Sequence, residues 1–209
     1  MKLPTSQSRV YEHGEVFTPP EIVDRMLGHV QEELNPYDSR VLEPACGSGN
    51  FLIPILSKKL RDVDEIYGSN SGEHLTRGLH ATMSIYGIEL LRDNVVACRN
   101  RLLRYFADWV GPDEPQEWVR AAENVVHLNV VHGDARTLKQ ITGEPVQFSE
   151  WSIAGDLCFD RREFQLADLL ASNDFAEATL FDPIDPLEMF TPVRAQLKLG
   201  LQEIAELSN

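Results

Sequence analysis

The 209-residue sequence has few cysteines, a shortage of basic residues and no long apolar run. Its three cysteines, Cys46, Cys98 and Cys158, are far apart and odd in number, so they form neither a metal-ligand spacing nor a disulfide framework. No apolar run approaches the roughly 18 to 20 residues that span a membrane. Residues 1–15 contain no apolar segment of the kind found in signal peptides. We therefore expect a cytoplasmic protein with reduced thiols, no bound metal and no membrane association.

The shortage of basic residues limits what the chain can bind. Its 19 Lys and Arg against 33 Asp and Glu give a formal net charge of −14. Affinity for DNA comes largely from Lys and Arg side chains that contact phosphates. DNA therefore repels a chain this acidic unless the basic residues of the chain are clustered. Arg99, Arg101 and Arg104 lie close together, but their helical spacing favours a solvated helix face. The composition therefore opposes strong DNA binding by the chain alone.

Apolar periodicity and turn residues predict strands alternating with helices in the first two-thirds of the chain. The predicted strands are 40–45, 82–90 and 127–135, and the predicted helices are 18–34, 50–61, 92–109 and 116–122. The polar, glycine-rich residues 68–78 between the second helix and the second strand read as a loop. This alternation is typical of a doubly wound α/β fold with a mostly parallel sheet.

The pattern weakens after Asp134. Residues 145–155 are expected to form a fourth strand, 164–171 a short helix and 192–207 an amphipathic C-terminal helix. No segment reads as an interdomain linker, so residues 1–209 are expected to form a single domain. Within it, residues 136–209 form a divergent acidic C-terminal part.

The stretch VLEPACGSGNFLIPIL, residues 41–56, reads as a strand, a glycine turn and the start of a helix. Gly47 and Gly49 let the backbone approach a ligand without a Cβ in the way. A dinucleotide fingerprint needs a third glycine where Leu52 stands, and a Walker loop needs a Lys-Ser or Lys-Thr pair that is missing. A purely structural turn is the alternative. The turn thus indicates a nucleotide-like ligand of another kind.

Two acids stand where the next strands end. Glu89 lies at the end of the predicted strand 82–90, and Asp134 lies at the end of the predicted strand 127–135. An ionised carboxylate only accepts hydrogen bonds, which suits the hydroxyl and amino groups of a nucleoside. Each acid can instead cap the segment that follows it. His132, beside Asp134, is expected to be a packed histidine rather than a catalytic one.

Four segments carry a family resemblance. FTPPEIVDRML, LEPACGSGNFL, YGIEL and VVHGDA resemble motifs X, I, II and III of the adenine-N6 DNA methyltransferases, in the order used by the type I and type IIG enzymes. The resemblance covers about residues 14–135, two-thirds of the chain. It implies a Rossmann-like methyltransferase fold and S-adenosylmethionine as the cofactor.

The resemblance also implies which residues hold that cofactor: Phe17, Thr18, Glu43, Ala45, Gly47, Gly49, Phe51, Glu89, Asp134 and Ala135. The loop that contains Gly47 and Gly49 would lie beneath the methionine part. Glu89 would accept hydrogen bonds from the two ribose hydroxyls, and Asp134 would accept one from the adenine amino group.

The family's catalytic clamp is missing. Members carry Asn or Asp, then Pro-Pro and Tyr or Phe, after the fourth strand, where polar oxygens accept both N–H hydrogens of a flipped adenine and the aromatic ring stacks on it. This chain has no such tetrapeptide, so its catalytic residues are unknown. Glu150 with Trp151, and Asp182 with Pro183, are the candidates for a degenerate clamp. A buried tryptophan beside a capping acid, and an ordinary loop, are the alternatives.

The C-terminal part is strongly acidic. Residues 150–209 contain twelve acids and four bases, a net charge of −8 in the region where DNA would be expected. Such a segment suits a protein partner better than phosphate. A DNA methyltransferase of restriction-modification type, minimal or split with a partner subunit that recognises DNA, is therefore one function. A catalytically inactive cofactor-binding or regulatory protein, and a methyltransferase for a non-DNA substrate, stay open as alternatives.

Overall fold

The structure is a computed structural model that describes residues 18–30, 34, 36–68, 72–171 and 194–207. Its elements are, in chain order, α2 (Pro20–His29), β1 (Val41–Glu43), α3 (Leu52–Tyr67), α4 (Gly72–Met83), β2 (Ile85–Glu89), α5 (Arg92–Val110), α6 (Gln116–Asn129), β3 (Val130–Asp134), β4 (Lys139–Gln140), β5 (Gln147–Gly155), β6 (Cys158–Gln165), α7 (Leu166–Ala171), β7 (Arg194–Gly200) and α8 (Leu201–Ala205). Within these residues, no helix combines the length and apolar character needed to cross a membrane.

A parallel sheet forms the centre of the fold. Strands β1, β2 and β3 are adjacent and parallel, and the short β4 closes the order β1-β2-β3-β4 as an antiparallel strand. The predicted strands 40–45, 82–90 and 127–135 contain these three parallel strands. The predicted α/β class with a parallel sheet is therefore confirmed.

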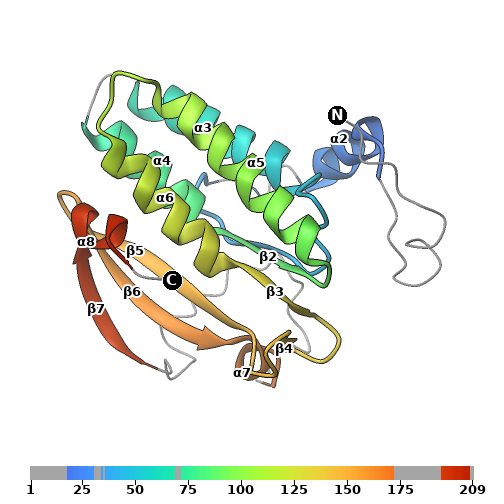
Figure 1. The fold of residues 1–209 in the computed structure, drawn as a ribbon. Coiled ribbons are helices and arrows are strands. Elements are labelled where there is room, and N and C mark those ends of the chain that lie inside the picture. The colour runs from blue at the N-terminus through green and yellow to red at the C-terminus, as the bar shows by residue number, and fades with distance from the viewer. Residues whose placement is uncertain (1–17, 31–33, 35, 69–71, 172–193, 208–209) are drawn as a thin grey trace.

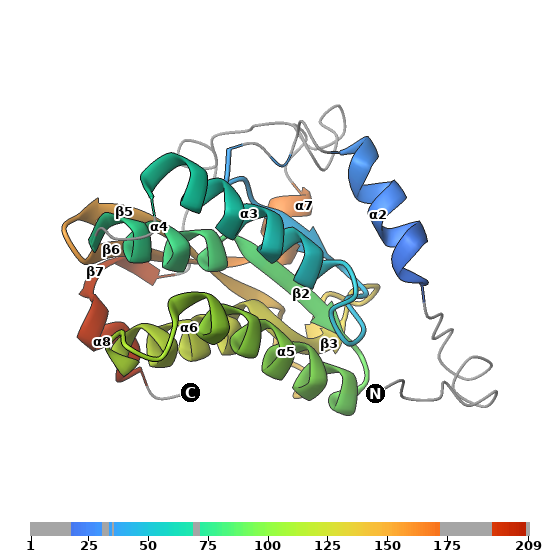
Figure 2. The same ribbon diagram turned by 90° about the horizontal axis from the view of Figure 1, so that it is seen from above.

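The two faces of this sheet pack against different layers. Ile85 and Val130 belong to the main core with the helices α3 to α6, whereas Tyr86, Ile88 and Val131 belong to a second cluster with residues of β5 and α7. Figures 1 and 2 show α3, α4, α5 and α6 side by side over one face. In the described residues the other face is covered by β5 and α7, so a doubly wound arrangement stays a prediction.

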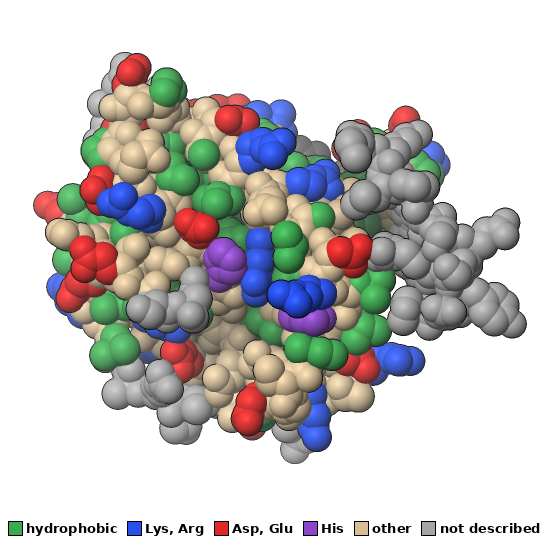
Figure 3. Space-filling view, in the orientation of Figure 1, with side chains coloured by type: hydrophobic (Ala, Val, Ile, Leu, Met, Phe, Trp, Pro, Cys, Tyr) green, Lys and Arg blue, Asp and Glu red, His purple; other side chains and the backbone are tan. Residues whose placement is uncertain are grey.

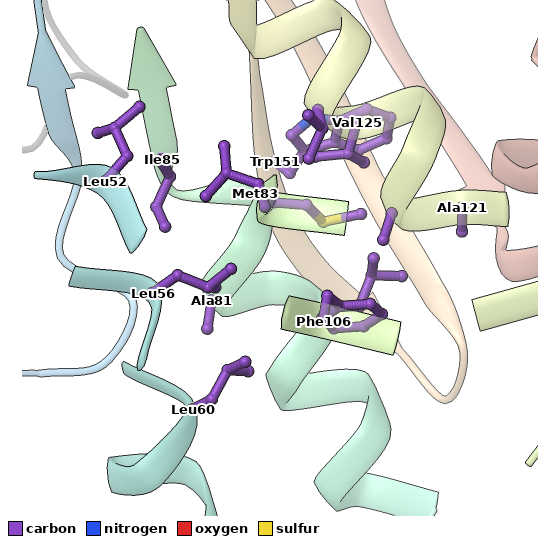
Figure 4. Close-up of a cluster of buried hydrophobic side chains, with 14 of the residues drawn as sticks. Leu52, Leu56, Leu60, Ala81, Met83, Ile85, Phe106, Ala121, Val125 and Trp151 are labelled. Atoms are coloured by element: carbon purple, nitrogen blue, oxygen red, sulfur yellow. The ribbon is translucent and has the colours of Figure 1, made fainter. Parts of the chain in front are cut away.

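The main core lies between the helices and the two sheets. Figure 4 shows its central side chains, with Phe106 of α5, Met83 of α4 and Trp151 of β5 close together. Phe106 and Leu56 are fully buried, and Trp151 is 5% exposed. Trp151 is therefore a core residue that joins the second sheet to the helical layer.

Strands β5, β6 and β7 form a separate antiparallel sheet. The predicted strand at 145–155 is confirmed as β5, but it pairs with β6 and not with the parallel sheet. The predicted helix over 192–207 is wrong, since residues 194–200 form β7 and only 201–205 are helical. In RAQLKLG, polar and apolar residues alternate with a period of two, which fits a strand better than a helix.

The predicted loop over 68–78 is also wrong, because helix α4 begins at Gly72. Leu75 and Leu79 of this helix are buried in the main core. Gly78 permits the close approach of α5, since a Cβ there would lie 2.1 Å from Cη2 of Trp109. Tertiary packing thus stabilises a helix whose local composition suggests a loop. Helix α6 is likewise longer than predicted and replaces the first residues of the predicted strand 127–135.

Candidate cofactor-binding site

The predicted site residues meet at the carboxyl ends of the parallel strands. Glu43 ends β1 and pairs with Gly87, and Glu89 ends β2 and pairs with His132 of β3. Asp134 ends β3, so three acids mark the ends of three adjacent strands. In open α/β sheets, ligands bind at this edge. The glycine loop, which we define as residues 44–51, connects β1 to α3 at the same edge.

Glu89 holds the glycine loop against β2. The Gly47 N–H donates to its Oε2 at 2.9 Å, and the Leu91 N–H donates to its Oε1 at 2.8 Å. The residue is 8% exposed. A carboxylate oxygen accepts more than one hydrogen bond, so Glu89 can hold the loop and still accept from the hydroxyl groups of a ligand.

Two glycines give the loop its shape. Gly47 and Gly49 have φ values of +54° and +88°, which side chains with a Cβ rarely adopt. The Cys46 N–H donates to the Ile88 carbonyl at 3.0 Å, and the Gly49 N–H donates to the Cys46 carbonyl at 2.8 Å. A Cβ at Gly49 would also lie 3.0 Å from Cys98 Sγ. The loop is therefore a tight turn that lies against both β2 and α5.

Two buried thiols lie behind this loop. Cys46 and Cys98 are both buried and reduced. A hydrogen bond with Cys98, followed by burial, raises the pKa of the Cys46 thiol well above its usual range. Because the thiolate is the reactive form, the raised pKa disfavours Cys46 as a nucleophile and fits a packing role behind the loop.

Asp134 holds the turn after β3 and lies at the edge of the site. Its Oδ1 accepts a hydrogen bond from the Arg136 N–H at 2.8 Å, and Arg136 Nε lies 3.6 Å from the same oxygen. The side chain is 24% exposed. Asp134 therefore acts as a cap, the alternative that its sequence position allows, and keeps part of its carboxylate accessible. Ala135 packs beside it against the second cluster.

The other predicted cofactor residues lie around the loop. The Ala45 N–H donates to Glu43 Oε1 at 3.2 Å, and burial raises the pKa of the Glu43 carboxyl while that hydrogen bond lowers it. Phe51 packs against the main core at the start of α3. Thr18 is half-buried just before α2. Phe17 lies outside the described residues.

His132 connects neighbouring strand ends. Its Nε2 lies 3.0 Å from the carbonyl oxygen of Leu90, which follows β2. The ring nitrogen donates in this pair, because a carbonyl only accepts. The contact supports the interpretation of His132 as a structural histidine.

The clamp candidates Glu150 and Trp151 lie at the opposite end of the sheet. Glu150 pairs with Arg40, which precedes β1, at 2.7 Å. The Trp151 carbonyl accepts from Nε2 of His80, which lies shortly before β2, at 3.1 Å. The Ser149 N–H donates to Asn129, the residue before β3. Strand β5 thus crosses the amino ends of all three parallel strands, so the structure does not bring Glu150 or Trp151 to the glycine loop. Asp182 and Pro183 lie outside the described residues.

Arg101 is a site residue that sequence reasoning misses. From α5, its Nη1 donates to the Ser48 carbonyl at 2.6 Å, to Ser48 Oγ at 3.2 Å and to Asn50 Oδ1 at 3.1 Å. Arg99 is also engaged, since its guanidinium donates to the Val130 and His127 carbonyls. The predicted solvated face therefore supplies two structural contacts. Helical spacing carries no signal for either, because each partner lies far away in the sequence.

The groups that this edge offers are hydrogen-bonding groups. In the described part of the chain, no three His, Cys, Asp or Glu side chains come together in a group that could hold a metal ion. What the edge does offer is carboxylate acceptors on adjacent strands and a glycine loop in which the Gly47 C=O and the Ser48 N–H have no hydrogen-bond partner among the described residues. That combination suits an uncharged nucleoside joined to a zwitterionic group better than a polyphosphate. The reason is that the carboxylates of Glu89 and Asp134 would repel phosphate groups.

Comparison with known proteins agrees with this geometry. The model of the family described as N-6 DNA Methylase matches residues 5–105. The match covers slightly less than half of the chain, includes the glycine loop, Glu89 and Arg101, and ends before Asp134. It supports a methyltransferase of this family. No curated protein and no solved structure gives a significant match.

Proposed function

We propose that this chain is an S-adenosylmethionine-dependent methyltransferase of the N-6 DNA methylase family that acts on the adenine amino group of DNA. The observation that carries the proposal is the convergence of the glycine loop, Glu89 and Asp134 on three adjacent strand ends. The family match over residues 5–105 supports it independently. We further propose a restriction-modification context of the type I or type IIG kind.

The residues at the edge fit the parts of the proposed cofactor. Gly47 C=O and Ser48 N–H belong to one peptide unit that makes no hydrogen bond with any residue described, so they offer an acceptor and a donor to the amino-acid end. Glu89 would accept from the ribose hydroxyls and Asp134 from the adenine amino group. When bound, S-adenosylmethionine supplies an electrophilic methyl group on sulfur.

The protein's part in the transfer would be orientation. Direct displacement of the methyl group by a nitrogen nucleophile needs the reacting atoms in line and water excluded, with no covalent protein intermediate. The strand ends and the loop would fix one reactant by its hydrogen bonds. Acceptors for the two adenine N–H hydrogens would come from residues outside the described ranges or from a partner subunit.

A partner subunit would also supply the phosphate contacts. The net charge of −14 opposes DNA binding by this chain alone. On the face shown in Figure 3, basic and acidic side chains are scattered, and the basic ones form no continuous patch among the described residues. The acidic C-terminal part is our proposed surface for a protein partner.

The first test is calorimetric titration of S-adenosylmethionine into the wild-type chain and Asp134→Ala. We expect micromolar-range binding by the wild type and about tenfold weaker binding by the variant, because one hydrogen bond to a charged group is lost. Asp156→Ala, an exposed acid in the β5–β6 turn, is the control for removal of one negative charge. A well-folded wild-type chain that binds no cofactor would refute the proposal.

A second candidate function is a catalytically inactive, cofactor-binding regulator. Its support is the position of Glu150 and Trp151 at the amino ends of the strands, which leaves no clamp candidate beside the glycine loop in the described residues. Methylation of a substrate other than DNA would need only the same cofactor-binding residues, so it is a further alternative.

Titration with unmodified duplex DNA at two salt concentrations separates an enzyme that binds DNA by itself from a regulator and from an enzyme whose partner subunit supplies the phosphate contacts. An enzyme that holds DNA itself predicts binding that weakens steeply as salt rises, because each neutralised phosphate releases a counterion. A regulator predicts no binding by the isolated chain. Binding that is independent of salt would contradict a phosphate-based contact.

A further inference from the structure

We propose that Arg101 is a positioning residue that fixes the glycine loop in its cofactor-binding form before the cofactor arrives. This inference rests on the proposed function, since it assigns Arg101 a role in binding S-adenosylmethionine. The guanidinium reaches from α5 to the loop and makes three hydrogen bonds with Ser48 and Asn50, the shortest of them 2.6 Å to the Ser48 carbonyl.

The geometry of the loop shows what Arg101 controls. The peptide unit between Ser48 and Gly49 is held at both ends, because its C=O accepts from Arg101 and its N–H donates to the Cys46 carbonyl. The peptide unit between Cys46 and Gly47 is held in the same way by Gly49 N–H and Glu89 Oε2. Two fixed units flank the unit between Gly47 and Ser48, so their contacts determine where that middle unit points.

The peptide unit between Gly47 and Ser48 has a hydrogen-bond acceptor and a hydrogen-bond donor that are available to a ligand. Its Gly47 C=O and Ser48 N–H have no partner within the described ranges. A carbonyl accepts from an ammonium group and an N–H donates to a carboxylate, so this unit complements an α-amino acid. Arg101 therefore acts on the methionine end of the cofactor and not on its nucleoside end, which Glu89 and Asp134 face.

Prearrangement has a thermodynamic reason. Two glycines in three residues make the loop conformationally free, and ordering such residues costs conformational entropy. A loop that protein contacts already hold in place does not lose this conformational entropy when the cofactor binds. The position of Arg101 fits such a role, because the residue is exposed and its guanidinium donates to Ser48 and Asn50 of the loop.

The test is calorimetric titration of two ligands into Arg101→Ala, Arg101→Lys and Arg104→Ala. S-adenosylmethionine carries the amino-acid end, and 5′-methylthioadenosine lacks it. We expect Arg101→Ala to weaken S-adenosylmethionine about five- to tenfold and to leave 5′-methylthioadenosine unchanged. Arg101→Lys should restore affinity to within about threefold, because an ammonium can still donate to the Ser48 carbonyl. Arg104→Ala is the control, an exposed arginine one turn further along α5.

The outcomes separate this inference from the proposed function. Equal affinity of wild type and Arg101→Ala for S-adenosylmethionine would overturn the inference alone. An equal loss for both ligands would also overturn it, because that result indicates a general disturbance of the site. A wild-type chain that binds neither ligand would overturn the proposed function and this inference with it.

Discussion

Replacing Glu89 with alanine should lower the affinity for S-adenosylmethionine by about 100-fold or more. The carboxylate has two tasks at once. It accepts from Gly47 N–H at 2.9 Å and Leu91 N–H at 2.8 Å, and in the proposed complex it also accepts from both ribose hydroxyls. The variant loses these ligand contacts and releases Gly47, so the loop and the ribose site are damaged together.

Calorimetric titration measures this effect, with Glu89→Gln and Asp108→Ala alongside. Glutamine keeps the shape but turns one acceptor into a donor, so we expect an intermediate loss of affinity. Asp108 is an exposed acid on α5 whose removal changes the net charge equally, and its variant should bind as the wild type does. Thermal unfolding of each variant confirms that it is folded. Undiminished binding by folded Glu89→Ala would show that the strand ends do not hold the ribose.

The placement of the candidate residues at one edge of the sheet could be predicted from the sequence because they are local features of strand ends. A glycine turn after a strand, and an acid at the end of the next strand, are each visible within about ten residues of sequence. Parallel strands place such features at one edge, and the order β1-β2-β3 does so here. The long helix α5 was equally predictable from its apolar periodicity.

Other features depend on contacts that no local pattern shows. Helix α4 contains glycines and polar residues typical of a loop, yet Leu75 and Leu79 enter the core and Gly78 accommodates Trp109. Strand β7 is hard to distinguish in the sequence because a short alternating segment runs directly into the helix α8. Arg101 contacts a loop 53 residues earlier in the chain, which helical spacing cannot reveal.

The position of β5 is the case with the greatest consequence for function. Its sequence correctly predicts a strand, but pairing with β6 and contacts with Arg40, His80 and Asn129 place it across the amino ends of the parallel strands. Trp151 thereby enters the main core. The sequence pattern predicts that a strand forms, but it does not predict which sheet the strand joins. The position of Glu150 therefore follows from the sheet topology.

Lys59 connects α3 to the turn before β1. It is completely buried, and its Nζ donates to the Tyr37 carbonyl at 2.8 Å and to the Ser39 carbonyl, with Ser39 Oγ at 3.2 Å. Burial lowers the pKa of Lys59 from 10.5 to about 7. The neutral amine still satisfies this site, because two N–H groups can donate to the two carbonyls while its lone pair accepts from the Ser39 hydroxyl.

This lowered pKa makes the free energy of unfolding depend on pH. Between about pH 7 and 10.5 the unfolded chain holds a proton on Lys59 that the folded chain has released. The free energy of unfolding should therefore rise with pH through that window, by up to about 1.4 kcal/mol per pH unit. Below about pH 7 both states are protonated, and this contribution no longer changes.

Lys59→Met should remove that rise and lower the free energy of unfolding by about 2–4 kcal/mol at pH 9, since two buried carbonyls lose their donor. The difference between wild type and variant should shrink at pH 6, where the wild type carries a buried charge. Urea denaturation at both pH values measures it, and the comparison cancels groups that titrate alike in both proteins. Lys58→Met removes the partner of Asp62, a half-buried pair at 2.6 Å, and should keep the wild-type pH slope. Parallel curves for wild type and Lys59→Met would show instead that Lys59 stays charged in the folded chain, held by its three oxygen partners.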